Sequence, residues 1–374
     1  MSKRNFDYRW TLKDAVFTKD KGKVFSCFAC GGGSTMGYKR SGFDVIGCNE
    51  IDPKMADCYS HNHHPKYLFL EPIQLFKLRD TEENLIKKYG FENYKTMNGK
   101  NLLMPDELYN LDILDGSPPC SSFSMAGNRS EDWGKDKVFR EGQAKQVLDT
   151  LFFDFIDVAE KLQPKVVVAE NVRGLMMGDA IQYVRRIYDA FEKAGYNVQH
   201  WLLDASKMGV PQKRERVFFV ALRNDLCGKF IYQKDLFTHA PMLDLDFDEP
   251  EIPFSMCTNN EEASDKKISE IALKYWHLTK KGSDFSEAAG GSYFNWIRLN
   301  DAAPTRTLHT RGEIIYHPDV CRPISDVEFA LCSSFPSDYD YRKMKTAYIC
   351  GMSVPPVMTA QVAKRIYDQW LSKL

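Results

Sequence analysis

The feature that most constrains the fold is an alternation of short apolar runs with helix-like segments, which begins at Lys23. Strand-like runs, rich in β-branched and aromatic residues, occupy residues 24–28, 43–50, 111–120, 165–172, 198–205 and 216–223. Apolar residues recur at helical spacing around Tyr38, over 148–164 and over 181–196. Because helices separate most of the strands, the alternation predicts an α/β domain with a mostly parallel sheet.

The alternation stops after Arg223. Residues 226–305 are instead rich in acidic residues, prolines and aromatics, as in PMLDLDFDEPEIPF and GGSYFNW. From Thr346 the chain returns to a turn followed by a helix-like segment. We therefore expect one domain made of residues 1–225 and 346–374, interrupted by a smaller domain over 226–345.

Composition limits the classes of function. The 374 residues include 50 Lys and Arg against 51 Asp and Glu, so any nucleic-acid binding must depend on a local basic face. No apolar stretch approaches the roughly 18 residues of a membrane span. The N-terminal sequence MSKRNFDYRWTLKDAVF lacks the apolar region of a secretory signal. Ten cysteines without regular spacing indicate reduced thiols, and we expect a cytoplasmic protein.

A glycine-rich turn, CFACGGGSTMG, follows the first strand-like run. Such a turn between strand and helix lets the backbone approach a ligand. The dinucleotide-binding pattern fails at Met36, and the phosphate-binding P-loop fails at Tyr38, where it requires lysine. Glu50 ends the second run, where it could bind ribose hydroxyls. The turn indicates a nucleoside site without a tight phosphate cradle; the alternative is a turn that is merely tight.

Two patterns near this turn resemble metal or redox sites. Cys27 and Cys30 form a C-x-x-C pair, but no second pair exists to complete a zinc site. His61, His63 and His64 are also clustered, and we interpret them as solvated turn residues. We expect no metal.

The segment DGSPPCSSFS places Cys120 just beyond the end of a strand-like run, after two prolines. The prolines restrict the backbone, which favours presentation of the thiol to a cleft. A nucleophilic cysteine needs nearby positive charge or a helix N-terminus, because a free thiol has a pKa of about 8.5. The alternative is a buried structural cysteine.

Two further motifs supply polar groups at strand ends. Glu170 and Asn171 end the run 165–172, and a desolvated carboxylate there could donate a proton. In GVPQKRERVFFV, Gln212, Arg214 and Arg216 alternate, so their side chains should share one face. Paired arginines suit a carbonyl oxygen, a phosphate or a carboxylate. The alternatives are a structural ion pair and a solvated strand edge.

The order of these motifs is informative. The chain runs from the glycine turn through Glu50, Pro119-Cys120 and Glu170-Asn171-Val172 to the Gln-x-Arg-x-Arg pattern, and GMSVPP follows near its end. From about Val24 to the C-terminus, apart from residues 226–300, the sequence strongly resembles the DNA (cytosine-5)-methyltransferase family of prokaryotic type. The match extends to phrases such as FEKAGYNVQHWLLDASKMGVPQ and RPISDVEFALCSSFPSDY. It implies the Rossmann-like fold of S-adenosylmethionine-dependent methyltransferases, with a smaller target-recognition domain.

The resemblance implies methyl transfer from S-adenosylmethionine to C5 of a cytosine flipped out of a specific double-stranded DNA sequence. Cys120 would attack C6 and form a covalent adduct that activates C5. Glu170 would act at N3, and Arg216 would hold the O2 carbonyl. Arg214 would support the pocket, and Asn171 would fix the turn before Cys120.

The same resemblance assigns the binding residues. S-adenosyl-L-methionine would contact Phe28, Gly31, Gly32, Gly33, Glu50, Ile51, Glu71, Leu151, Ser353 and Val354. We expect contacts with DNA from Ser124, Gln212, Arg298, Thr307 and Arg311. The polar run 121–137 would close over the DNA.

The chain departs from the family pattern at four positions. Cys30 and Met352 stand where the family has glycine and asparagine, and Ser121 stands where glutamine commonly follows the nucleophile. Glu71 stands where an aspartate would bind the adenine amine. These departures affect cofactor contact and loop closure and leave Cys120 intact.

Double-stranded DNA is the expected partner, and a cognate restriction endonuclease is a candidate companion. We expect a monomer without membrane contact. Three alternatives are the transfer-RNA-methylating branch of the same family, a catalytically silent relative and a nicotinamide-dependent oxidoreductase. Intact Cys120, Glu170 and Arg216 argue against the second, and the broken glycine pattern argues against the third.

Overall fold

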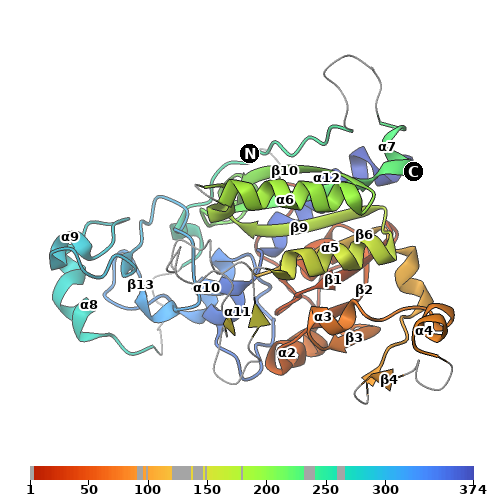
Figure 1. Ribbon diagram of the computed structural model, residues 1–374. Coiled ribbons are helices and arrows are strands. Elements are labelled where there is room, and N and C mark those ends of the chain that lie inside the picture. The colour runs from red at the N-terminus through yellow and green to blue at the C-terminus, as the bar shows by residue number, and fades with distance from the viewer. Residues whose placement is uncertain are drawn as a thin grey trace.

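The computed structural model describes residues 4–90, 96–97, 100–119, 136–137, 146–147, 150–177, 180–230, 241–258 and 266–374. Its centre is a seven-stranded sheet (Figure 1). From one edge to the other, the strands are β10 (Tyr196–Asp204), β11 (Glu215–Arg223), β9 (Val166–Val172), β6 (Ile113–Gly116), β1 (Lys23–Cys27), β2 (Asp44–Glu50) and β3 (Tyr67–Leu70).

The prediction of a mostly parallel sheet is confirmed. Strands β9, β6, β1, β2 and β3 run parallel to one another, and β11 is antiparallel to both β9 and β10. Neither the reversal at β11 nor the short edge strand β3 was predicted. The chain passes outward from β1 to β3 and then returns to β6 on the other side of β1. Ligands of open α/β sheets bind outside the carboxyl ends of the strands at such a switch point.

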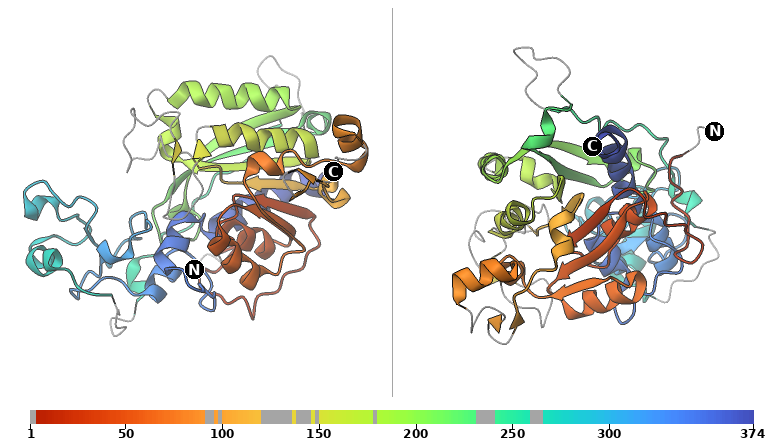
Figure 2. Two further views of the ribbon diagram at one scale, coloured as in Figure 1. Left: turned by 60° about the horizontal axis from the view of Figure 1, so that its bottom comes forward. Right: turned by 90° about the vertical axis from the view of Figure 1, so that its right-hand side faces the viewer.

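Helices cover both faces of the sheet (Figures 1 and 2). The α-helices are α1 (Gly33–Arg40), α2 (Pro53–His63), α3 (Ile73–Phe76), α4 (Glu82–Tyr89), α5 (Leu151–Leu162), α6 (Ala180–Lys193), α7 (Asn224–Cys227), α8 (Glu270–Tyr275), α9 (Ser286–Ala289), α10 (Asp326–Cys332), α11 (Thr346–Met352) and α12 (Pro356–Gln369). Within the described residues, none of these helices is long and apolar enough to cross a bilayer.

Strand side chains alternate between two apolar layers. Phe25 of β1 and Val167 of β9 pack with α3, α5 and α6, whereas Val24 and Val166 pack with α1 and α12. Helix α12 comes from the far end of the sequence, and its side chains complete the apolar layer on one face of the sheet. This arrangement places the segment before α12 close to the glycine turn before α1.

The region between α7 and α10 is built on a smaller core. The two-residue strands β12 (Ile297–Arg298) and β13 (Ile315–Tyr316) pair in parallel beside a cluster that includes Phe285 and Ala272. Two other pairs of two-residue strands in the described residues are β4 (Thr96–Met97) with β5 (Lys100–Asn101), and β7 (Asp136–Lys137) with β8 (Gln146–Val147).

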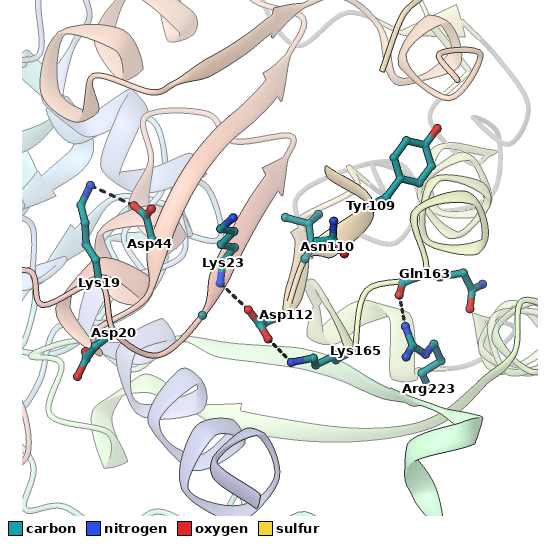
Figure 3. A pocket seen from close by; sticks show the side chains of 12 residues that line it. Lys19, Asp20, Lys23, Asp44, Tyr109, Asn110, Asp112, Gln163, Lys165 and Arg223 are labelled. Carbon is teal, nitrogen blue, oxygen red and sulfur yellow. Dashed lines mark hydrogen bonds and ion pairs between the residues drawn. The ribbon is translucent and has the colours of Figure 1, made fainter. Parts of the chain in front are cut away.

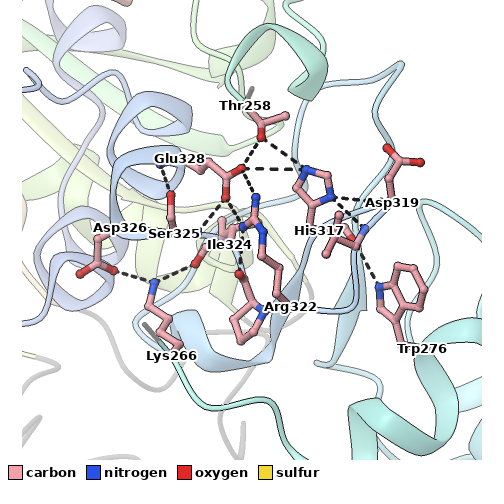
Figure 4. Close-up of polar contacts among 12 residues, drawn as sticks. Thr258, Lys266, Trp276, His317, Asp319, Arg322, Ile324, Ser325, Asp326 and Glu328 are labelled. Carbon is pink, nitrogen blue, oxygen red and sulfur yellow. Dashed lines mark hydrogen bonds and ion pairs between the residues drawn. The ribbon is translucent and has the colours of Figure 1, made fainter. Parts of the chain in front are cut away.

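A buried polar network connects this smaller core to α10 (Figure 4). Arg322 forms two hydrogen bonds with the carboxylate of Glu328, at 2.7 and 2.8 Å. Glu328 also accepts from the backbone N–H of Ser325, which caps the helix reciprocally. Trp276 donates to the carbonyl of His317 at 2.9 Å. Burial of this ion pair requires these partners, because an unpaired charge in a core is costly.

The N-terminal residues before β1 lie across several distant segments. The Trp10 indole donates to Ser334 O at 2.9 Å, and the backbone N–H of Leu12 donates to Asp338 at 2.6 Å. Tyr8 donates to Met256 O at 3.1 Å and is buried. These contacts join the segments that enter and leave the smaller region.

Candidate active site

Glu170 and Arg216 lie together at one end of the sheet. Glu170 on β9 is opposite Phe218 of β11, and Arg216 is opposite Val172, so the two side chains are diagonal neighbours on one face. Their ion pair measures 2.9 Å between Arg216 Nε and Glu170 Oε1, with 13% and 11% of the side chains exposed. Burial lowers the pKa of Arg216, although the charge of Glu170 opposes this effect. The pair is therefore a partly desolvated acid and cation at a strand edge.

Asn171 fixes the chain that leaves β6. Its Nδ2 donates to Pro118 O at 3.1 Å, and its Oδ1 accepts from the backbone N–H of Val172 at 2.9 Å. Cys120 lies two residues beyond Pro118 in the sequence. Cys120, Ser121, Ser124 and most of the run 121–137 lie outside the described residues.

Arg214 is held by carbonyl groups from distant parts of the chain. Its Nη1 donates to Leu308 O at 3.0 Å, and its Nη2 donates to Gly351 O at 2.9 Å and Ser353 O at 3.0 Å. Only 2% of the residue is exposed, and burial lowers the pKa of its guanidinium. In this structure Arg214 connects the end of the smaller region to the segment before α12.

The glycine-rich turn after β1 has a constrained backbone. Phe28 (φ 55°), Cys30 (φ 49°) and Gly32 (φ 81°) all adopt left-handed conformations. Such conformations persist at non-glycine residues only where the surroundings impose them. A Cβ on Gly32 would lie 2.1 Å from His63 Nε2, and one on Gly33 would lie 2.3 Å from Val354 O. These glycines are therefore required by contacts with α2 and the C-terminal segment.

Glu50 closes the turn at the end of β2. Its Oε2 accepts from Cys30 N, and its Oε1 accepts from the backbone N–H groups of Ile51 and Asp52, each at 2.8 Å. Burial raises the pKa of Glu50, although these N–H groups lower it. Oε2 has one backbone donor and therefore retains a lone pair for a ligand hydroxyl.

The remaining residues expected at the cofactor site have different surroundings. Glu71, just after β3, forms a buried two-point ion pair with Arg79, at 2.5 Å to Nε and 3.2 Å to Nη2. Phe28 and Ile51 are partly exposed. Leu151, the first residue of α5, is fully buried in the apolar layer that α5 forms against the sheet.

Ser353 and Val354 are both buried beside the glycine turn. A Cβ on Gly33 would lie 2.7 Å from Ser353 Cβ, which shows how closely the two segments approach. The C-terminal segment therefore reaches the carboxyl end of β1, although more than three hundred residues separate them in the sequence.

The residues expected to contact DNA divide into buried and exposed groups. Gln212 is 1% exposed; its Nε2 donates to Cys332 O at 3.2 Å, and its Oε1 accepts from Leu308 N at 3.1 Å. Arg298 donates to carbonyls of Trp276, Thr279 and Pro318 and stacks on the Trp276 ring at 3.9 Å. Both side chains hold protein backbone in this structure.

Thr307 and Arg311 are exposed. The Thr307 hydroxyl donates to Lys213 O at 2.8 Å, and Arg311 forms a 3.4 Å ion pair with Glu313. Their positions leave both residues accessible to a macromolecular ligand.

Two buried residues near the turn were missed or misread from the sequence. Asp115 of β6 accepts hydrogen bonds from Ser26 at 2.7 Å and Ser34 at 2.8 Å, and burial raises its pKa to about 6. The interpretation of His63 as a solvated turn residue is wrong, because His63 ends α2 and is 6% exposed. Within the described residues, no group of three histidine, cysteine or acidic side chains could hold a metal.

A cavity of about 480 Å³ lies at the opposite, amino-terminal edge of the sheet (Figure 3). Its lysines are paired: Lys19 with Asp44 at 3.1 Å and Lys165 with Asp112 at 2.7 Å. This cavity contains none of the residues expected to act in catalysis. The chemistry-bearing side chains instead gather at the carboxyl edge.

Known proteins share both the sequence and the fold. The model for C-5 cytosine-specific DNA methylase matches residues 22–368. The chain is 30% identical to the type II methyltransferase M.NgoPII of Neisseria gonorrhoeae, over 92% of this chain and 95% of the relative. It is 34% identical to M.FnuDI of Fusobacterium nucleatum, but that match spans 54% of this chain and 48% of the relative.

Among solved structures, a DNMT2 variant from Spodoptera frugiperda is similar with a TM-score of 0.57 and 16% identity, over 92% of this chain and 99% of that chain. A protein encoded within an Escherichia coli prophage is similar with a TM-score of 0.60 and 20% identity, over 93% and 99%. These likenesses concern the fold. Together with the family match over nearly the whole chain, they lead to one conclusion: the chain belongs to the C-5 cytosine-specific DNA methylase family and is a DNA cytosine-5 methyltransferase.

Proposed function

We propose that this enzyme transfers a methyl group from S-adenosylmethionine to C5 of a cytosine flipped out of a specific double-stranded DNA sequence, through a covalent bond between Cys120 and C6. The observation that carries the proposal is the partly desolvated Glu170–Arg216 pair, at 2.9 Å, next in the chain to Asn171, which holds the Pro118 carbonyl. This arrangement brings an acid and a cation to the strand edge from which the chain leaves toward Cys120.

The chemical step follows from the weakness of cytosine C5 as a nucleophile. Addition of the Cys120 thiolate to C6 moves electron density into the ring and makes C5 an enamine carbon. Glu170 supplies a proton or hydrogen bond at N3, and Arg216 stabilises negative charge at O2. Within the described part of the chain, Arg216 uses Nε on Glu170 and Nη1 on Glu215 O, which leaves Nη2 to donate. After C5 is methylated, loss of its proton and departure of the thiolate restore the aromatic ring.

The residues around the glycine turn fit a nucleoside cofactor. Glu50 retains an acceptor position for a ribose hydroxyl, and Ile51 and Phe28 offer apolar surface beside it. S-adenosylmethionine would supply an electrophilic methyl group there. Glu71 already accepts hydrogen bonds from Arg79 with both carboxylate oxygens. An adenine amine that donated to Glu71 would therefore share this carboxylate with Arg79.

We place DNA recognition in the region between α7 and α10, within residues 226–345. Arg311 and Thr307 are exposed there, while Arg298 and Gln212 maintain the backbone that carries them. Support comes from the cluster around Phe285 and Tyr316, which gives this region buried apolar contacts distinct from those on the two faces of the sheet.

The covalent route is tested with Cys120→Ala. This variant should lose methyl transfer while it retains binding of DNA and cofactor, and a duplex with 5-fluorocytosine should trap the wild-type enzyme at Cys120. Methylation by the variant, or an adduct mapped to another residue, would refute the route.

Substrate and target sequence are tested together by two assays. Bisulfite sequencing of DNA from cells that express the protein should reveal one methylated sequence context. Parallel methylation of duplex DNA and transfer RNA should favour DNA, and preference for transfer RNA would overturn the proposed substrate. A defined target would then direct the search for a cognate restriction endonuclease.

A further inference from the structure

The carbonyl oxygen of Gly31, in the middle of the glycine turn, receives two side-chain contacts from distant segments. We propose that His63 and Tyr339 are positioning residues for the cofactor, because their hydrogen bonds to Gly31 O hold the turn in the conformation that sets Glu50 at its end. This inference rests on the proposed function, since it assumes that the cofactor binds at this turn. It concerns two residues that would act through the turn and not on the methyl group.

The two contacts come from different parts of the fold. The Tyr339 hydroxyl donates to Gly31 O at 2.6 Å, and His63 Nε2 lies 3.3 Å from the same oxygen. His63 ends α2, and Tyr339 belongs to the segment between α10 and α11. Both residues are buried, so no water competes freely for the carbonyl.

The protonation state of His63 is determined by these surroundings. Burial, and then the charge of Lys39, lower the pKa of His63 to about 3, so the ring is neutral at ordinary pH. A carbonyl oxygen can only accept, so the proton of the neutral ring must be on Nε2. Nδ1 then has no proton to donate, and among the described residues it has no hydrogen-bond partner. The tautomer is thus specified by Gly31.

The turn needs such support because of its conformation. Cys30 at φ 49° and Gly32 at φ 81° flank Gly31, and a left-handed cysteine is strained unless its neighbours impose it. Gly31 O is the acceptor between them, and Cys30 N is the donor to Glu50 Oε2 at 2.8 Å. Rotation of the peptide units around Gly31 would move Gly31 O and Cys30 N together. Loss of either contact to Gly31 O should therefore weaken binding at Glu50.

Packing restricts alternatives to this arrangement. The His63 ring lies edge-on to Tyr59 at 4.7 Å and at 6.2 Å from the Tyr339 ring. Asn62, beside His63, exchanges two hydrogen bonds with the backbone of Asp340, at 2.8 and 2.9 Å. Helix α2 and the segment around Tyr339 are therefore joined as one unit against the turn.

Tyr339→Phe removes one hydroxyl and keeps the ring. It should raise the dissociation constant for S-adenosylmethionine about threefold to tenfold, the effect of one neutral hydrogen bond. The rate at saturating cofactor and the KM for DNA should stay close to those of the wild type. Binding is measured by calorimetry with the full-length protein, and rates are measured by transfer of labelled methyl groups.

Tyr341→Phe is the matched control. Tyr341 is a neighbour in the same segment; its hydroxyl lies 3.5 Å from Cys350 Sγ, and among the described residues it has no hydrogen bond to Gly31 O. A purely structural role for Tyr339 predicts equal effects of the two substitutions on unfolding and on cofactor binding. A positioning role predicts that only Tyr339→Phe changes the dissociation constant.

A second pair of variants tests His63. Gln places an amide N–H near the position of Nε2, whereas Asn does not reach it, so His63→Gln should bind cofactor more tightly than His63→Asn. Cofactor affinity of Tyr339→Phe equal to that of the wild type, or equally reduced in Tyr341→Phe, would overturn the inference alone. Failure of the wild-type protein to bind S-adenosylmethionine would overturn the proposed function and this inference with it.

Discussion

Replacement of Arg214 by methionine distinguishes a buried connection from a catalytic contact. Methionine has a similar length and no donor, so the carbonyls of Leu308, Gly351 and Ser353 would lose the partners they have at 2.9 to 3.0 Å. Each hydrogen bond to a charged group contributes about 1.5–3 kcal/mol. Desolvation of the guanidinium, evident in the lowered pKa of Arg214, offsets several kcal/mol of that gain. We expect a net loss of about 2–4 kcal/mol of unfolding free energy.

Arg214→Lys should not recover the unfolding free energy that Arg214→Met loses. Its ammonium group keeps the cost of a buried charge, but it lacks the planar fork that reaches three carbonyls at once. Arg214→Lys should therefore be no more stable than Arg214→Met. Urea unfolding followed by tryptophan fluorescence measures both variants, and calorimetry measures cofactor affinity, which should fall because Ser353 lies against the glycine turn.

Arg173→Met provides the control for a lost arginine. Arg173 pairs with Glu215 at the surface, so its removal should cost less than about 1 kcal/mol. The reasoning is refuted if Arg214→Met unfolds at the wild-type urea concentration. If that variant also binds the cofactor normally but transfers no methyl group, Arg214 contacts the substrate directly.

Three further predictions concern buried carboxylates. Glu170→Gln should lower the methyl-transfer rate by about 10²-fold or more while DNA binding persists, because the amide cannot donate the proton needed at N3; a near-normal rate would contradict this role. Burial raises the pKa of Asp115 to about 6, so the ionised carboxylate is less stable in the folded protein than in the unfolded chain. The free energy of unfolding should therefore increase as the pH falls from 6 to 4 and Asp115 becomes protonated in the folded state. Asp115→Asn should remove a difference on the order of 2 kcal/mol between these pH values in urea unfolding, and an unchanged pH dependence would reject the assignment. Glu328→Gln should cost about 3–5 kcal/mol, because Arg322 would remain buried without its counterion; thermal unfolding at the wild-type temperature would contradict this.

Much of the central sheet and of the helices that cover it was predictable because the sequence signals for them are local. Each of the six strand-like runs overlaps a strand of the sheet, and the helical spacing over 148–164 and 181–196 corresponds to α5 and α6. Strand β3 was missed because YLFL is a short edge strand whose side chains are only partly buried. Such a run has too little contrast between its faces to be distinguished from a loop.

The site residues show where local reasoning stops. Alternation in the sequence leading into β11 predicts that Gln212, Arg214 and Arg216 share a face. It does not reveal that Arg216 meets Glu170 while Arg214 is enclosed by backbone carbonyls. The backbone that surrounds Arg214 comes from segments 94 and 137 residues away.

The sequence by itself determined the family, the six strand-like runs that overlap strands of the sheet, and the helical segments that correspond to α5 and α6. Periodicity and local backbone preferences act over a few residues, and a printed sequence displays them directly. Tertiary structure alone decided that His63 is buried against Gly32, that Arg79 forms an ion pair with Glu71 and that the C-terminal segment packs beside Gly33. Burial and hydrogen-bond partners depend on which remote segments pack together, and that packing is a property of the whole chain.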